Sequence, residues 1–255
     1  PWNGVIAKVD IKNQNWNFAA FTGSGKTQLV TDFVKDFYKR FRKKVQIAWN
    51  GGYILNAELV GKLGLPESYI GSPLGLLITT ESSARDSVGT VVCPPLYNKP
   101  AFIIYADGRL DICRVNCSNG IIISDGKHTI DFDKRSHNLI PRSSPPVSLY
   151  YDLMHDEETI DGNGNVIVRL AGNKIKEVIH TKKGQKVKII PVGLTLSIPK
   201  SLFPQKWNKI DKKLEIKIKP DKNIENPVGQ GHALALQKIT SIDWNNIRYA
   251  VEAGP

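Results

Sequence analysis

The chain has 255 residues, of which 41% are hydrophobic and 23% charged, as is ordinary for a globular protein that buries a real core. It contains no apolar run long enough to cross a bilayer, and its first residues lack the basic-then-apolar pattern of a signal peptide. The formal net charge of +11 favours anionic partners. No aromatic side chains interleave with the basic run over 212–219, so we expect no nucleic-acid partner.

The first part of the chain predicts a helix among a few strands, from apolar spacing and turn residues. The expected elements are strands over 4–11 and 16–21, a helix over 27–41 with Thr27 as its N-cap, a short buried strand over 45–49, a helix over 56–63 closed by Gly64, and a strand over 74–80.

The rest of the chain predicts strands joined by tight turns. Strands are expected over 101–105 and 110–115, and Asp107-Gly108 between them indicates a type I′ hairpin turn. From residue 121 onward, short strand patterns alternate with turns rich in Gly, Asn and Pro.

This order of elements predicts an α+β fold with a mixed or antiparallel sheet, a few packed helices and a β-rich insertion. Residues 138–147 are rich in Pro and Ser and are typical of a linker. We therefore expect one domain from residues 1–137, a β-rich insertion over 138–235, and a return to the first domain over 236–255.

The segment Ala20–Thr27 is similar to a P-loop, in which a glycine-rich turn and a lysine, here Lys26, hold phosphate groups. Ala20 stands where that motif has its first glycine, and no acidic residue ends the next strand pattern to hold magnesium. The chain also lacks the strand–helix alternation of a parallel nucleotide-binding sheet. We favour an ordinary polar turn and keep nucleotide binding as an alternative.

The segment Asn50-Gly51-Gly52-Tyr53 follows an apolar pattern directly. Its two glycines free the backbone for close approach to a ligand. Asn50 offers an amide donor and acceptor, and Tyr53 offers a hydroxyl and a ring face. On its own, the segment predicts no more than a turn between two elements.

Three later segments change that interpretation. They are Gly71-Ser72-Pro73-Leu74-Gly75-Leu76-Leu77-Ile78, Pro100-Ala101-Phe102-Ile103-Ile104-Tyr105-Ala106-Asp107-Gly108-Arg109, and Ala250-Val251-Glu252-Ala253-Gly254-Pro255. With Asn50-Gly51-Gly52-Tyr53, and in this order, they resemble the phosphodiester glycosidase family. That family has an Asn-Gly-Gly-Tyr/Phe-Phe element at a strand end, a Pro-x-Gly-Leu-x-Ile strand, an aromatic strand before Asp-Gly-Lys/Arg, and an Ala-Val/Ile-x-Ala/Ser-Gly-Pro element.

The resemblance extends to residues 147–152 and 165–178, which are similar to a β-rich insertion in longer bacterial members. Ile54 stands where the family has Phe, and it keeps an apolar side chain there. The family pattern continues past its Gly-Pro element. The resemblance therefore predicts that a segment after Pro255 completes the site.

The resemblance implies a hydrolase that cleaves between a sugar anomeric carbon and a bridging phosphate, as in an N-acetylglucosamine-1-phosphodiester. Phosphate, with a second pKa of about 6, leaves with little protonation, so the site must hold an anion and steady an oxocarbenium-like centre. The implied roles are catalytic for Asn50 and Glu252, and substrate-binding for Gly51, Gly52, Tyr53, Gly75, Arg248 and Gly254.

The expected partner is a sugar-phosphate or glycan substrate, without a cofactor, a metal or a membrane span. The family implies an extracellular or periplasmic location. Cys93, Cys113 and Cys117 lack zinc-ligand spacing, and they leave open one disulfide plus a free thiol. A non-catalytic module that binds glycans or polyanions is the second alternative.

Overall fold

The computed structural model describes residues 7–10, 17–21, 28–79, 90–95, 100–115, 120–133, 148–150, 159–219 and 246–252. The helices in these ranges are α1 (Val30–Phe41), α2 (Ala57–Lys62), η1 (Glu67–Tyr69) and η4 (Gln205–Asn208). The strands are β1 (Leu77–Thr79), β2 (Thr90–Cys93), β3 (Pro100–Tyr105), β4 (Leu110–Arg114), β5 (Gly120–Ser124), β6 (Thr129–Asp133), β7 (Ser148–Tyr150), β8 (Thr159–Asp161), β9 (Val166–Ala171), β10 (Lys174–His180), β11 (Lys186–Lys188), β12 (Leu194–Ile198), β13 (Glu215–Ile218) and β14 (Ile247–Glu252).

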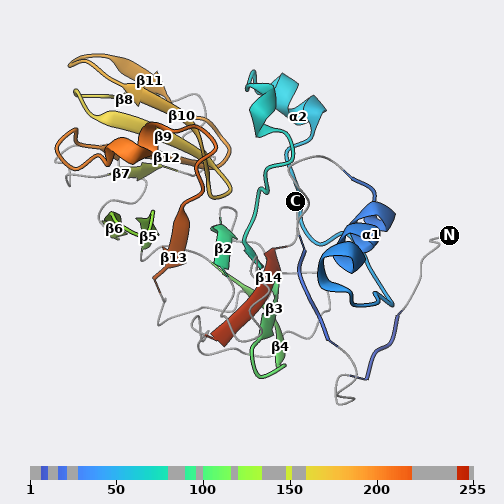
Figure 1. Cartoon of the computed structure of the whole chain (residues 1–255). Coiled ribbons are helices and arrows are strands. Elements are labelled where there is room, and N and C mark those ends of the chain that lie inside the picture. The colour runs from blue at the N-terminus through green and yellow to red at the C-terminus, as the bar shows by residue number, and fades with distance from the viewer. Residues whose placement is uncertain are drawn as a thin grey trace, which may run out of the picture.

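The main sheet has eight strands in the order β4-β3-β14-β1-β2-β13-β5-β6, and each neighbouring pair is antiparallel. β14 comes from far along the chain and lies between β3 and β1 (Figure 1). In that position Val251 is opposite Leu77 of β1 and Phe102 of β3. The last described strand is therefore an interior strand of the sheet.

A second, four-stranded antiparallel sheet has the order β10-β9-β12-β7, and β11 pairs with β8 as a separate ribbon. These strands run from 148 to 198 and lie within the range expected for the β-rich insertion. β13 lies within the expected insertion range of 138–235, yet it pairs with β2 and β5 of the main sheet. The α+β class, with largely antiparallel sheets and few helices, is confirmed.

One hydrophobic core joins the two sheets. It contains Ile103 and Ile123 of the main sheet together with Val168, Leu196 and Trp207 from the second part, and all five side chains are fully buried. Since both sheets contribute to this core, the second sheet is packed against the main sheet rather than tethered to it.

A smaller cluster fixes α2 and η1 against the second sheet. Val60 and Tyr69 pack there with Ala171, Ile190 and Val192. The expected helix over 56–63 is confirmed as α2. Its start is fixed by the Asn56 side chain, which caps the helix by accepting a hydrogen bond from Leu59 N at 2.8 Å.

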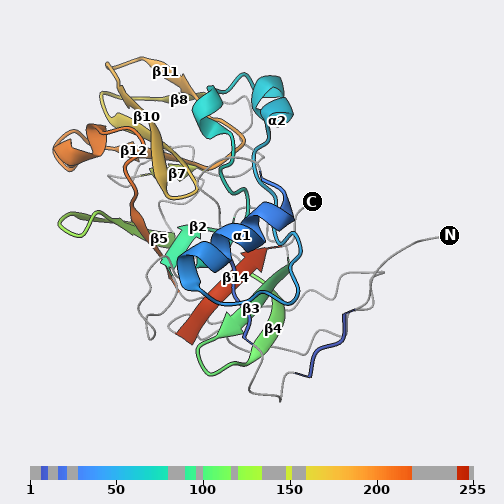
Figure 2. The same cartoon turned by 45° about the vertical axis from the view of Figure 1, so that its right-hand side comes forward.

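Helix α1 begins at Val30, with Leu29 as its N-cap, rather than at Thr27. Its apolar stripe packs around one ring: Phe21 lies 6.1, 5.4 and 6.0 Å from the ring centroids of Phe33, Phe37 and Phe41. Both views show the helix beside β14 and β3 (Figure 1 and Figure 2).

The buried strand expected over 45–49 is wrong. This segment is irregular, and Ile47 and Trp49 are 41% and 61% exposed. Its alternating apolar pattern needs a neighbouring strand to become a ladder, and none of the described strands pairs with it. Residues 7–10 and 17–21, the described parts of two other expected strands, are also irregular.

The β3–β4 hairpin is confirmed, although its turn is not type I′. The Gly108 N–H donates to the Tyr105 carbonyl at 3.0 Å, and Gly108 has φ of +86°. Ala106 and Asp107 are not in the positive-φ region that type I′ requires. The turn therefore places its glycine after the two central residues.

Cys93 and Cys113 are both buried, and Cys117 lies outside the described residues. None of the helices in the described ranges is long and apolar enough to span a membrane.

Candidate functional site

The segment Asn50-Gly51-Gly52-Tyr53 lies across the end of β14. A Cβ added to Gly51 would lie 2.8 Å from Val251 Cγ1, and one added to Gly52 would lie 3.2 Å from the Glu252 carbonyl oxygen. Any larger residue at position 51 would have to displace Val251 or the segment itself. The two glycines thus permit a close approach between this segment and the strand.

The same segment faces solvent. Asn50 and both glycines are exposed, and Tyr53 is 53% exposed. Among the described residues, no hydrogen bond uses the N–H groups of Gly51 and Gly52. Leu74 N donates to the Tyr53 carbonyl at 3.1 Å, which ties the segment to the residues before β1. The N–H groups of Gly51 and Gly52 therefore lie next to an exposed amide side chain without a partner in the described part of the chain.

The segment before β1 meets the same strand end. Leu76 N donates to Glu252 Oε2 at 2.5 Å, and Glu252 N donates to the Leu76 carbonyl at 2.8 Å. A Cβ added to Gly75 would lie 2.8 Å from that same Oε2 atom. Glycine at position 75 therefore leaves the space that the carboxylate occupies.

The contact of Gly51 with Val251 and the contact of Gly75 with Glu252 lie on opposite faces of the sheet. Successive side chains of a strand point to opposite faces, so the side chains of Val251 and Glu252 point away from each other. Glu252 is opposite Ala101, a fully buried residue, and is itself 2% exposed. The carboxylate therefore points into the core, away from the exposed Asn50 segment.

Arg248, another expected site residue, and Asp107, from the third motif segment, lie elsewhere. Arg248 is four residues before Glu252, which corresponds to about 13 Å along a strand, and its guanidinium carbon is 5.7 Å from the Tyr249 ring centroid. Asp107 lies in the hairpin beyond Tyr105, which is opposite Ile247 at the far end of β14.

Asp107 has a local role in that hairpin. Hydrogen bonds from Arg109 to its carboxylate hold the pKa of Asp107 below its ordinary value. Gly254 and residues 22–27, which contain Lys26, lie outside the described residues.

Sequence reasoning missed that an aromatic side chain and several basic side chains shortly before Asn50 in the chain are exposed. Trp49 was expected inside a strand, yet it lies exposed directly before Asn50. Arg42, Lys43 and Lys44 are exposed between α1 and this segment. The signal available in the sequence was the basic run itself, which follows the helix and precedes the two glycines by only a few residues.

These features define a candidate ligand-binding site. It is the exposed segment Asn50–Tyr53, which lies against the interior strand β14 and is hydrogen-bonded to Leu74 before β1. No family model and no curated protein matches the sequence. A solved structure described as a hypothetical protein from Synechocystis is similar over 77% of this chain, with 14% sequence identity and a TM-score of 0.32. The match spans 31% of that protein's length.

Proposed function

We propose that the protein is a phosphodiester glycosidase, which hydrolyses the bond between a sugar anomeric carbon and a bridging phosphate. One observation carries the proposal. Three of the four segments on which the family resemblance rests, around Gly51, Gly75 and Glu252, are in mutual contact at one strand end. The segments around Gly51 and Glu252 are about 200 residues apart in the sequence, so no local propensity explains their meeting.

The exposed segment supplies the groups that this reaction needs. The phosphate of the substrate stays anionic throughout, so backbone N–H groups of Gly51 and Gly52 can hold it without a proton transfer. Asn50 provides an uncharged donor and acceptor at the same edge. Tyr53 and Trp49 offer exposed aromatic faces for a sugar ring.

In this proposal Glu252 acts as a positioning residue. Its carboxylate is buried and accepts from Leu76 N, so it fixes the strand end behind the exposed segment rather than touching the substrate. Glu252→Gln keeps an oxygen acceptor for Leu76 N. We therefore expect Glu252→Gln to retain most activity, whereas a catalytic carboxylate would lose about a hundredfold or more.

A second candidate is a module that binds glycans or polyanions without turnover. The burial of Glu252 favours it, because the carboxylate carried over from the family motif is not at the exposed surface. Exposed cations at Arg42, Lys43 and Lys44 suit the same kind of ligand.

The test incubates the full gene product with a panel of sugar-1-phosphodiesters that includes N-acetylglucosamine, glucose and mannose, and measures the released sugar. We expect Asn50→Ala to lower kcat/KM by about a hundredfold, comparable to the loss of one oxyanion-stabilising amide. Gln46→Ala, an exposed amide four residues earlier, is the matched control and should be unchanged.

The outcomes separate the two candidates. Binding that Asn50→Ala weakens, without release of sugar by the wild type, supports the binding module. Folded protein that neither cleaves nor binds any member of the panel contradicts both.

A further inference from the structure

The positive charge of the protein is concentrated in one part of the chain. Residues 159–219 contain 14 basic and 4 acidic residues, a net charge of +10, whereas the whole chain carries +11. Most of these residues belong to the second sheet, the ribbon of β8 and β11, and the segment that follows β12. Both views show β10 and β11 well away from α1 and β4 (Figure 1 and Figure 2).

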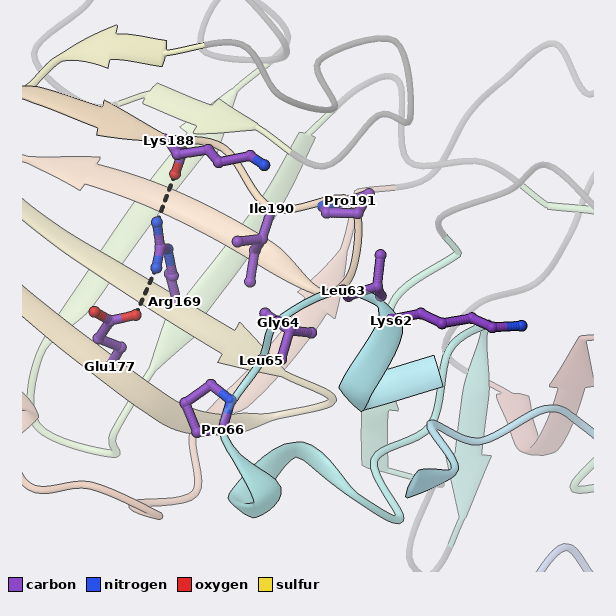
Figure 3. A pocket seen from close by; sticks show the side chains of 10 residues that line it. All are labelled: Lys62, Leu63, Gly64, Leu65, Pro66, Arg169, Glu177, Lys188, Ile190 and Pro191. Carbon is purple, nitrogen blue, oxygen red and sulfur yellow. Dashed lines mark hydrogen bonds and ion pairs between the residues drawn. The ribbon is translucent and has the colours of Figure 1, made fainter. Parts of the chain in front are cut away.

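The acidic side chains on either side of this charge are already paired. Glu177 accepts from Arg169 at 2.6 Å (Figure 3), and Asp211 is paired with Lys176 at 2.7 Å. Between these two acids, residues 178–210 contain seven lysines and no acidic residue. Six of the seven are exposed and form no ion pair in the described part of the chain: Lys182, Lys183, Lys186, Lys200, Lys206 and Lys209.

The segment after β12, residues 199–211, is fixed to the core by two aromatic rings. Phe203 and Trp207 are 6% and 0% exposed, and both belong to the hydrophobic core. Leu202 N donates to the Pro199 carbonyl at 2.9 Å, which closes a turn directly before the first ring. Because the two rings point inward, the side chains beside them are turned to solvent.

The outer side of this segment combines aliphatic and cationic side chains. Leu202 and Ile210 are 52% and 46% exposed. Each lies within two residues of an exposed lysine, Lys200 in the first case and Lys209 in the second. Since the aromatic rings of the segment are buried, it presents no aromatic face on which a base or a sugar could stack.

The turn between β10 and β11 adds further cations beside this segment. His180 Nε2 is hydrogen-bonded to Asn208 Oδ1 at 2.8 Å, and the His180 ring lies 5.8 Å from that of Phe203. These contacts bring the end of β10, and with it Lys182 and Lys183, next to η4. We call the exposed lysines and aliphatic residues of the two segments the lysine surface: Lys182, Lys183, Lys200, Leu202, Lys206, Lys209 and Ile210.

We propose that the lysine surface binds the face of an anionic lipid membrane. Its lysines would contact anionic headgroups, and Leu202 and Ile210 would leave water for the boundary between headgroups and acyl chains. A soluble polyanion would engage the same lysines but would leave both aliphatic side chains in water. The proposal is independent of the glycosidase proposal, since the lysine surface shares no residue with the Asn50 segment.

Sedimentation of the whole protein with lipid vesicles tests the proposal. One set of vesicles contains phosphatidylcholine alone, and the other contains phosphatidylcholine and phosphatidylglycerol in a ratio of about three to one. We expect the anionic vesicles to be bound at least about tenfold more tightly, and added salt to weaken that binding. Equal binding to the two sets, or binding to neither, overturns the proposal.

A pair of double variants separates the lysine surface from the net charge of the protein. Lys206→Gln combined with Lys209→Gln should weaken binding to the anionic vesicles about tenfold. Lys35→Gln combined with Lys39→Gln changes the net charge equally, but at exposed positions of α1, and should leave binding within about twofold of the wild type. Equal losses in the two double variants would show an effect of net charge alone and overturn the assignment.

The aliphatic residues separate a membrane from a soluble polyanion. Leu202→Ser combined with Ile210→Ser should weaken binding to the anionic vesicles about tenfold and leave the weaker binding of dextran sulfate unchanged. Because both side chains are about half exposed, the denaturation midpoint should change little, which confirms that the variant is folded. Vesicle binding that these substitutions do not weaken would assign the lysine surface to soluble polyanions and overturn the proposal.

Discussion

The contact between Gly75 and Glu252 predicts that alanine at position 75 strongly destabilises the protein. The new methyl group would lie 2.8 Å from Glu252 Oε2 and 3.1 Å from Glu252 Cβ. Forcing a methyl group into such a site costs about 1–3 kcal/mol. If the carboxylate moves aside instead, Leu76 N loses its acceptor, which costs a similar 1–3 kcal/mol. We expect a loss of about 1–3 kcal/mol in the free energy of unfolding, because relief of one cost incurs the other.

Urea denaturation followed by far-UV circular dichroism measures this loss. Gly61→Ala is the matched control: it lies in α2 with nothing within 4 Å of an added Cβ, so alanine there should stabilise by about 0.5–1 kcal/mol. Adding Glu252→Ala to Gly75→Ala should shrink the cost of the glycine substitution by at least about 1 kcal/mol. A loss at Gly75 no larger than the effect at Gly61 would refute the reasoning.

Three further predictions concern other contacts. Gly51→Ala should destabilise by about 1–3 kcal/mol because its Cβ meets Val251 Cγ1, and Val251→Ala should restore part of that loss in a denaturation series; additive effects would argue against the contact. Burial, with a contribution from a nearby aspartate, raises the pKa of Cys113 to about 12. In a Cys117→Ser background, the Cys113 thiol should therefore react with iodoacetamide at pH 8 only after unfolding. Rapid labelling of Cys113 in the folded protein would contradict its burial. Although desolvation opposes it, hydrogen bonds from two turn N–H groups hold the pKa of Asp125 well below its usual range, so its stabilisation is full above pH 4 and lost as the pH falls through the folded pKa. Asp125→Ala should therefore cost about 1–2 kcal/mol at pH 7 and progressively less below pH 4, and a cost that is constant with pH would oppose this account.

Local sequence signals predicted the elements that local contacts stabilise. The helix α2 followed from Asn56 as a cap and from the apolar spacing behind it, and both features act within a few residues. The β3–β4 hairpin followed from Gly108 for the same reason, although the position of the glycine within the turn did not. These predictions needed no knowledge of the rest of the chain.

The candidate site could be predicted only in part, because its geometry depends on distant pairing. The strand expected over 45–49 has a suitable pattern, yet whether Trp49 is buried depends on a neighbour that no local window contains. Glu252 is buried because Leu76 and Gly75 close over it from 176 positions away. The order of the motifs indicated that these segments belong together, whereas the face on which each side chain lies could not be predicted.

The position of β14 has a consequence for how the protein reaches its native state. Without β14, the main sheet would consist of two separate pieces. One is the hairpin of β4 and β3, and the other contains β1, β2, β13, β5 and β6 in that order. Each piece then presents an unpaired inner edge, and such edges are prone to association with other chains. Closure pairs Val251 of β14 with Leu77 of β1, which are 174 positions apart (251 − 77), so loop closure makes this step late and slow. Synthesis of residues 247–252 is thus the event that turns two aggregation-prone half-sheets into one, and chaperone dependence should be greatest just before it.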